Sequence, residues 1–238
     1  MLVQYTMRDI KNIEQKIIDG INKYVGKKNV FIGISGGIDS ALTAFLCVKA
    51  LGKKRVFGIL MPYGRQTDII DSFTVVKQLN IKYYQKDIKP IVDKYKISPN
   101  KYVLANLMSR TRMAILYAYA NHKDGLVVGT TNKSEMSVGY FTKFGDGGCD
   151  LEPIADLYKS EVYEMSKNLN VPKSIIDKKP TAGLWPDQTD EGEFGFSYGE
   201  LDKFLQGGHI NPELEVKIQD LIKNSEHKRK LPPIISVE

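Results

Sequence analysis

The apolar residues follow two periodicities along the chain, and their alternation predicts helices interleaved with buried strands. Ile10, Ile13, Ile17 and Ile21 recur every three or four residues, which indicates an amphipathic helix over 6–25. Four short apolar runs rich in β-branched and aromatic residues predict strands at 29–34, 55–60, 81–84 and 126–129. Further helical patterns lie between and after the strands, at 40–51, 67–79, 87–95, 100–121, 158–169, 172–177, 198–206 and 212–223.

The order of the first elements is that of a βαβ unit, with a strand, a turn, a helix and a second strand. The run at 55–60 is apolar without alternation, as expected for a parallel strand with both faces covered. The predicted fold class is therefore α/β, with a doubly wound, mostly parallel sheet and helices on both faces. A length of 238 residues suits one sizeable domain, so we expect a single domain over 1–238 with its ligand at the carboxyl ends of the strands.

The turn after the first strand has the composition of a phosphate site. It consists of Gly33, Ile34, Ser35, Gly36, Gly37, Ile38, Asp39 and Ser40. Glycines let the backbone approach an anion and tolerate positive φ, the amides of a helix's first turn point at the anion, and the serines add hydroxyl donors. The turn is not a Walker A loop, because no lysine lies between Lys28 and Lys49, and it lacks G-x-G-x-x-G spacing.

Asp39 is the unusual member of this turn. A carboxylate beside a phosphate cradle repels the ligand unless a divalent cation lies between them, so we interpret Asp39 as a magnesium ligand. The plainer alternative is that Asp39 is a helix N-cap. Glu135 ends the polar turn after the fourth strand; it could simply support a short helix, but as a second ligand it would meet Asp39 at the same sheet edge.

Three other segments have the composition of binding loops. Residues 61–66 follow the second strand, where a doubly wound fold usually holds the base and ribose of a nucleotide. The loop 139–150 is rich in glycine and aromatic residues, beyond what a connector requires. Residues 180–193 contain two prolines, two glycines and the single tryptophan, which predicts a lid.

The basic residues give weaker signals. Lys159 lies in the first turn of a predicted helix, an unfavourable place for a cation unless an anion is close. Arg110 and Arg112 are two positions apart on one helix and do not share a face, so at most one would point at a given anion. The net charge of +6 suits nucleotides or a weak nucleic-acid surface and decides between neither.

Composition excludes several classes of protein. The chain is 42% hydrophobic and 26% charged, which is ordinary for a soluble globular protein. Cys47 and Cys149 are far apart in the sequence, which argues against a zinc site or a disulfide framework, and Cys47 is expected in the core. No apolar run approaches the ~20 residues of a membrane span, so we expect a cytoplasmic protein.

These motifs resemble those of ammonia-dependent NAD synthetase over nearly the whole chain. The S-G-G-x-D-S loop at 35–40 is similar to that of all PP-loop ATP pyrophosphatases, which split ATP into AMP and pyrophosphate. The runs F-T-K-x-G-D-G-G at 141–148 and E-H-K-R at 226–229, in this order, are specific to the NAD synthetases. The resemblance implies an adenine nucleotide α-hydrolase-like fold and ATP-dependent amidation of deamido-NAD by ammonia.

The resemblance also implies roles for individual residues. ATP and its pyrophosphate would contact the loop 33–40 together with Gln66, Thr130, Lys159 and Thr181, and magnesium would bind Asp39 and Glu135. Deamido-NAD would meet Arg110, Lys143, Asp150, Glu193, His227 and Lys228. Asp146, Lys159 and Asp39 would be the catalytic residues, in a homodimer that binds neither nucleic acid nor membrane.

The chemistry of the implied reaction predicts two steps. A carboxylate reacts poorly with ammonia because its leaving group would be oxide, so the nicotinate carboxylate would first attack the α-phosphate of ATP and form a mixed anhydride with AMP. Ammonia would then displace AMP, with Asp146 stripping the ammonium proton or orienting the nucleophile. The lid over 180–193 would exclude water from the anhydride.

Three departures and two alternatives qualify this interpretation. Leu60 stands where many members of the family place an arginine that packs on the adenine, Gly183 stands where many have an acid, and the segment 226–230 is more basic than catalysis needs. A chain of this length has no room for a glutaminase domain, so ammonia should be the immediate nitrogen donor. The alternatives are a tRNA-modifying ATP pyrophosphatase, which would require a basic RNA-binding appendage, and a non-catalytic nucleotide-binding regulator, which would be expected to have lost Asp39 or Glu135.

Overall fold

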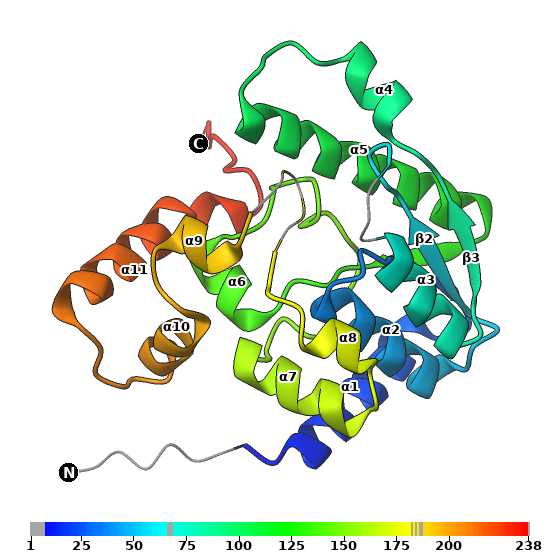
Figure 1. Cartoon of the computed structure of the whole chain (residues 1–238), viewed down its shortest axis with the longest axis horizontal. Helices are drawn as coiled ribbons and strands as arrows, with labels where there is room; N and C mark the ends of the chain where they lie inside the picture. The colour runs from blue at the N-terminus through cyan, green and yellow to red at the C-terminus, as the bar shows by residue number, and fades with distance from the viewer. Residues whose placement is uncertain (1–7, 66–68, 182, 184, 186–187, 238) are drawn as a thin grey trace.

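A four-stranded parallel sheet forms the centre of the chain, whose computed structural model describes residues 8–65, 69–181, 183, 185 and 188–237 (Figure 1). The strands are β1 Asn29–Gly33, β2 Val56–Leu60, β3 Lys82–Gln85 and β4 Gly125–Val128. Their order is β3-β2-β1-β4, and all three pairings are parallel, with Val30 opposite Val56 and Leu126. The predicted strands and the parallel, doubly wound α/β class are confirmed.

Helices cover both faces of this sheet. One face carries α2 (Ile38–Leu51) and α3 (Ile69–Gln78), and α1 (Ile10–Val25) packs on α2 and on α7 (Lys159–Asn168). The short helix α8 (Lys173–Ile176) contacts α2 and α7. The opposite face is covered by α5 (Lys101–His122), with α4 (Lys89–Lys94) packed beside it. All of these helices were predicted within a few residues of their observed ends.

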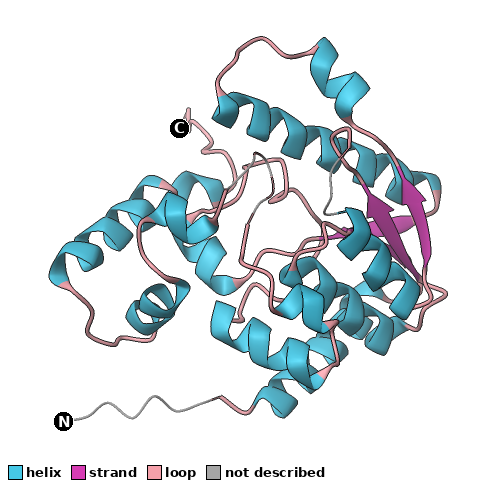
Figure 2. Cartoon of the chain, viewed as in Figure 1, coloured by secondary structure: helices cyan, strands magenta, loops and turns pink. Residues whose placement is uncertain are grey.

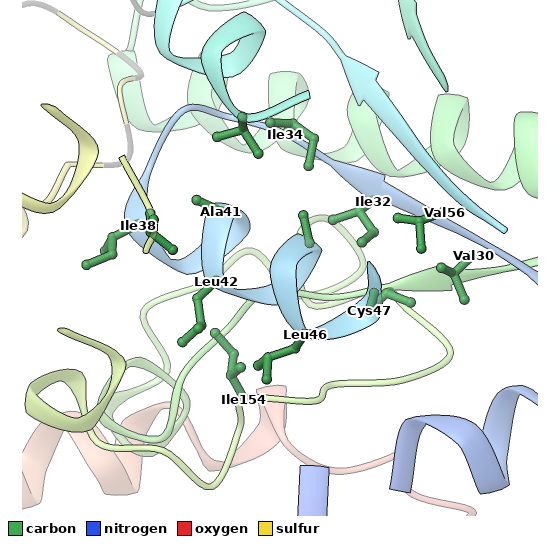
Figure 3. Close-up of a cluster of buried hydrophobic side chains, with 14 of the residues drawn as sticks. Val30, Ile32, Ile34, Ile38, Ala41, Leu42, Leu46, Cys47, Val56 and Ile154 are labelled. Carbon is green, nitrogen blue, oxygen red and sulfur yellow. The ribbon is translucent and has the colours of Figure 1, made fainter. Parts of the chain in front are cut away.

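The strand β1 supplies both cores because successive side chains of a strand point to opposite faces. Val30 and Ile32 lie in the cluster shared with α2, where Leu42 and Leu46 are fully buried (Figure 3). Phe31 points the other way and stacks on Phe57 of β2 with ring centroids 5.0 Å apart. This two-sided burial explains why β1 and β2 show no polar alternation.

A third apolar cluster lies away from the sheet, among the helices at the left of Figure 1. It joins α6 (Lys133–Val138), α9 (Asp190–Phe194), α10 (Tyr198–Leu205) and α11 (Pro212–Asn224), and the 3-10 helix Glu226–Lys228 follows. Phe194 and Phe196 stack at 5.3 Å within it. The sequence analysis did not predict α6 and α9, because each is too short to show a helical period.

Both cysteines are free, and Cys47 is buried in the core as predicted, where burial raises the pKa of its thiol to about 12. Within the described part of the chain, no helix combines the length and the apolar character needed to cross a bilayer.

Candidate active site

The loops after β1 and β4 meet at the carboxyl edge of the sheet. The chain passes from β1 to β2 on one side, whereas after β4 it bridges Val128 at Leu151 on the other side, which opens a crevice between the ends of β1 and β4. A cavity of about 530 Å³ occupies this place, and its lining includes Ser35, Asp39, Thr130 and Thr181. Figure 2 shows loops converging in the middle of the molecule, between the sheet and the α9–α11 group.

The glycine turn is a preorganised backbone cradle. Gly36 has φ +83°, which only glycine adopts readily, whereas Gly37 is extended at φ −84° and is the N-cap of α2. Gly36 therefore uses the freedom of glycine to adopt positive φ, and Gly37 does not. Ser40 Oγ donates to Gly37 O at 3.0 Å and lies 3.1 Å from Ser35 Oγ, so the two serines brace the turn from within.

Asp39 is not the N-cap of α2, because Gly37 takes that position. Its carboxylate instead accepts hydrogen bonds from two residues far along the chain. Lys159 Nζ donates to Oδ2 at 2.6 Å and Asn132 Nδ2 donates to Oδ1 at 2.8 Å. The side chain is 18% exposed and lines the cavity, so it faces a ligand while being held by two donors.

Lys159 joins Asp39 to Glu135. Its side chain is 2% exposed, and Nζ also lies 3.0 Å from Glu135 Oε1, so both carboxylates share one ammonium. Burial works against the charged lysine, but the two carboxylates outweigh it and raise the pKa of Lys159. The lysine is therefore charged at neutral pH, and its unfavourable position at the start of α7 is compensated by anions of the protein itself.

Glu135 has two structural roles at once. It closes a capping box on α6, in which Asn132 Oδ1 accepts from Glu135 N at 3.0 Å and Glu135 Oε2 accepts from Asn132 N at 3.3 Å. Its Oε1 meets Lys159 and the hydroxyl of Tyr198, the latter at 3.1 Å. Burial raises the pKa of Glu135, and the ammonium of Lys159 only partly opposes this.

Tyr198 carries the network on to helix α9. Its hydroxyl lies 2.9 Å from Asp190 Oδ2, and Asp190 Oδ1 is 3.1 Å from the hydroxyl of Tyr140. Asp190 is 4% exposed and lines the cavity, and burial raises the pKa of its carboxyl group. The segment predicted as a lid is thus connected through Tyr198 to the same oxygen of Glu135 that contacts Lys159.

The loop 139–150 folds back on helix α5. Asp146 Oδ1 accepts from Ser109 Oγ at 2.6 Å and from Thr142 N at 3.0 Å, and Asp146 lines the cavity. Gly145 is required for this packing, since a Cβ there would lie 2.3 Å from Ser109 Oγ. The loop is therefore held in one conformation, with Asp146 at the cavity.

The residues expected at deamido-NAD fall into two groups. Glu193 and Lys228 line the cavity, and Lys228 Nζ donates to the carbonyl oxygens of Gly139 at 2.7 Å and Phe141 at 2.9 Å. Outside the lining are Arg110, Lys143, Asp150 and His227.

The second group makes contacts within the chain. Lys143 Nζ donates to His227 O, and Arg110 Nε donates to Lys143 O at 3.3 Å. Asp150 accepts from Tyr117 at 3.1 Å and from Val127 N at 2.8 Å. Of the residues expected at ATP, Gln66 lies outside the described residues.

A half-buried acid that the sequence analysis did not single out lies beneath the loop after β4. Glu152 accepts from Thr131 N at 3.1 Å and from the thiol of Cys149 at 3.2 Å. A Cβ on Gly129 would lie 2.3 Å from its carboxylate, so a larger residue there would displace the carboxylate. Burial raises the pKa of Glu152 to about 7.

Sequence reasoning assigned no role to three other residues of the site, Asn132, Asp190 and Tyr198. It weighed Arg112 beside Arg110 but gave the ligand contact to Arg110. The N-x-x-E spacing of Asn132 and Glu135 was a signal for a capping box. Tyr198 gave no signal, because it meets Glu135 only through the tertiary fold.

Comparison with known proteins identifies the family. The model of the NAD synthase family matches residues 10–232. The chain belongs to this family. A relative from Pyrococcus horikoshii named NH(3)-dependent NAD(+) synthetase is 45% identical, in an alignment that covers 91% of this chain and 93% of the relative.

Two solved structures of related synthetases have the same fold. The NMN synthetase from Francisella tularensis matches with a TM-score of 0.90 and 37% identity, over 95% of this chain and 98% of that one. The NH3-dependent NAD synthetase from Campylobacter jejuni matches with a TM-score of 0.80 and 34% identity, over 97% and 100% of the two chains. Membership of the NAD synthase family favours the predicted ligase over a tRNA-modifying enzyme or a regulator.

Proposed function

We propose that the chain catalyses the amidation of deamido-NAD by ammonia, with conversion of ATP to AMP and pyrophosphate. The observation that carries this proposal is the group of Asp39, Lys159 and Glu135 beside the glycine turn. A backbone cradle for phosphate and an adjacent pair of carboxylates are what a metal-dependent ATP pyrophosphatase requires. The nicotinate carboxylate attacks the α-phosphate, pyrophosphate leaves, and ammonia then displaces AMP from the mixed anhydride.

The donor set at this edge suits magnesium. Asp39 and Glu135 come from the ends of neighbouring strands and offer hard carboxylate oxygens close to one another, and Mg²⁺ is commonly bound by one or two carboxylates plus substrate phosphates. When bound, the ion would neutralise charge on the phosphate oxygens of ATP. Lys159 would hold the two carboxylates in place and add positive charge near the departing pyrophosphate.

Asp146 is placed to handle the nitrogen nucleophile. Its Oδ1 is fixed by Ser109 and Thr142, while Oδ2 has no hydrogen-bond partner among the residues that the structure describes. A carboxylate oriented in this way can accept a proton from ammonium at the cavity. Residues 180–193 would close over the reaction and exclude water, and Asp190 would link this segment to Glu135 through Tyr198.

A homodimer would bring the remaining deamido-NAD residues into use. On α5, Val103, Arg110, Ala114 and Ala118 are exposed at spacings of seven, four and four residues, which places them on one face of the helix. This mostly small or apolar face is suited to a second copy of the chain. Arg110 would then meet a dinucleotide bound near the subunit interface, together with Lys143 and His227.

A mononucleotide is a second candidate substrate. The match to the NMN synthetase, with a TM-score of 0.90, exceeds the 0.80 of the match to the NH3-dependent NAD synthetase. Amidation of nicotinate mononucleotide would use the same reacting carboxylate and would leave the sites for the second nucleotide empty. The cytoplasm is the proposed compartment, where the free thiols of Cys47 and Cys149 would stay reduced.

The test supplies the purified chain with ATP, magnesium and ammonium, and with deamido-NAD or nicotinate mononucleotide in parallel. We expect NAD, AMP and pyrophosphate in equal amounts, a higher kcat/KM for deamido-NAD, and no turnover when glutamine replaces ammonium. A higher kcat/KM for nicotinate mononucleotide would transfer the proposal to the mononucleotide. Absence of turnover with both acceptors would refute it.

A further inference from the structure

Arg112 is a cation of the cavity that forms no ion pair with a carboxylate of the described residues. It lies on α5, one helical turn after Ser109, and its side chain is half-buried in the cavity lining. Nε donates to Met61 O at 3.0 Å, and the two terminal nitrogens have no hydrogen-bond partner among the described residues. Burial lowers the pKa of Arg112 to about 10, which leaves it charged at neutral pH, and the charge of Asp146 opposes the shift.

Most other cations of the site already have partners or lie outside the cavity. Lys178 pairs with Asp71 at 2.9 Å, and Lys179 is an exposed residue of the lining, on the segment that follows α8. Lys159 is neutralised by Asp39 and Glu135, and Lys228 donates to two backbone carbonyl oxygens. Arg110, two residues before Arg112, is exposed and does not line the cavity. Of these two arginines, Arg112 therefore faces the cavity of its own chain.

The topology shows which part of ATP would meet this guanidinium. The pyrophosphate cradle follows β1, and the adjacent strand β2 ends one residue before Met61, on the side where a doubly wound fold holds base and ribose. ATP that spans these two strand ends must place its α-phosphate, the phosphate next to the ribose, between them. Arg112 is fixed to Met61 O at that point.

We propose that Arg112 binds a non-bridging oxygen of the α-phosphate of ATP and stabilises the charge that develops there during adenylation. In this step a carboxylate oxygen of the acceptor forms a bond to the α-phosphorus, and the bond from phosphorus to pyrophosphate breaks with its electron pair leaving on pyrophosphate. The planar guanidinium donates a hydrogen bond to the phosphoryl oxygen in bound ATP and in the transition state of adenylation. The bond is stronger in the transition state, because negative charge develops on that oxygen. The inference rests on the proposed function.

The test uses ATP with sulfur in place of one non-bridging α-phosphate oxygen, as each of the two diastereomers, and measures AMP formation with ammonium and deamido-NAD. The wild-type chain should be slowed unequally by the two diastereomers, since one replaces the oxygen that Arg112 contacts. Arg112→Met should lower kcat/KM for ATP by ~10²–10³-fold, the scale for a lost donor to developing charge. In the same variant, the two diastereomers should slow AMP formation equally, because neither sulfur then replaces an oxygen that Arg112 contacts.

Two further variants separate binding from folding. Arg112→Lys keeps the charge and loses the planar fork, so it should be intermediate in rate, and added guanidinium should partly restore Arg112→Ala. Arg55→Met is the matched control, because Arg55 donates to Gly26 O and Lys28 O at 2.6 Å each, just before β2 begins at the opposite end of that strand. It should leave both the rate and the diastereomer ratio unchanged.

The outcomes distinguish this inference from the proposed function. A wild-type chain that forms no AMP with ATP and deamido-NAD refutes the function itself. If the wild-type chain is active, either of two results for the folded Arg112 variants overturns the role of Arg112. One is a diastereomer ratio equal to that of the wild type, and the other is a loss of less than about threefold in kcat/KM. If Arg112→Met does not fold, as judged by its thermal unfolding, the same ratio measured on Arg112→Lys decides.

Discussion

Replacing Lys159 by methionine would leave two carboxylates of the active site without their shared cation. Methionine nearly preserves the length of the side chain, so the packing of α7 should change little. Asp39 and Glu135 would remain, with side chains 18% and 12% exposed. Removing one partner of a buried ion pair costs about 3–5 kcal/mol, because the remaining charge is buried without compensation.

This loss should be visible in the free energy of unfolding. For a chain of 238 residues, 1 kcal/mol corresponds to ~2–4 °C in Tm, so Lys159→Met should lower Tm by ~6–20 °C in the absence of magnesium and ATP. The loss should be smaller at pH 5 than at pH 8. A carboxyl group whose pKa is raised in the folded state, as for Glu135, stabilises the fold while protonated and loses that contribution as the pH rises.

The matched control is Lys230→Met. Lys230 pairs with Glu226, and both side chains are more than half exposed, at 67% and 58%, so the loss should be much smaller than for Lys159→Met. The assay is urea unfolding at pH 5 and pH 8 with each variant, together with the rate of AMP formation, which Lys159→Met should abolish. Equal stability of the two variants at both pH values would refute the reasoning on the buried cation.

Three further predictions follow from the site. The pKa of Glu152 is raised to about 7, so the protonated side chain stabilises the fold and this contribution is lost as the pH rises through that value. The free energy of unfolding of Glu152→Gln should therefore exceed that of the wild type by up to about 3 kcal/mol at pH 8 and equal it near pH 4. A difference in the free energy of unfolding, measured with urea, that is the same at both pH values would contradict this. Asp146→Asn should still form the adenylate, while amide formation falls by ~10² or more; equal loss of both steps would make Asp146 a substrate-positioning residue. Trp185, the single tryptophan, lies 5.4 Å from the ring of Tyr102 and 4.4 Å from Lys101 Nζ, so its fluorescence should change when ATP and deamido-NAD bind; a constant spectrum would count against movement of the lid.

The sequence predicted the sheet and its principal helices because their patterns are strong. The runs of β1 and β2 are almost entirely apolar, and the glycine turn marks the end of β1. The helices α6 and α9 are six and five residues long and bury few residues each, so no period could reveal them. They form only because α10 and α11 offer an apolar surface to pack on.

Those residues of the site that lie in local sequence motifs could be predicted, and those that only the tertiary fold brings in could not. Asp39, Glu135 and Lys159 could be assigned from motifs, and the fold brings them together. The contact of Tyr198 with Glu135 joins residues 63 positions apart and leaves no local pattern. Spacing alone showed that Arg110 and Arg112 diverge, but only the orientation of α5 decides which of them faces the cavity.

The adenylated intermediate is tested most directly by following the carboxylate oxygens. Deamido-NAD labelled with oxygen-18 in its nicotinate carboxylate is converted with ATP, magnesium and ammonium, and the products are examined by mass spectrometry. The account predicts one labelled oxygen in AMP, one in the amide of NAD and none in pyrophosphate, because the carboxylate attacks the α-phosphate and that oxygen leaves with AMP. Label in pyrophosphate, or AMP without label, would contradict it.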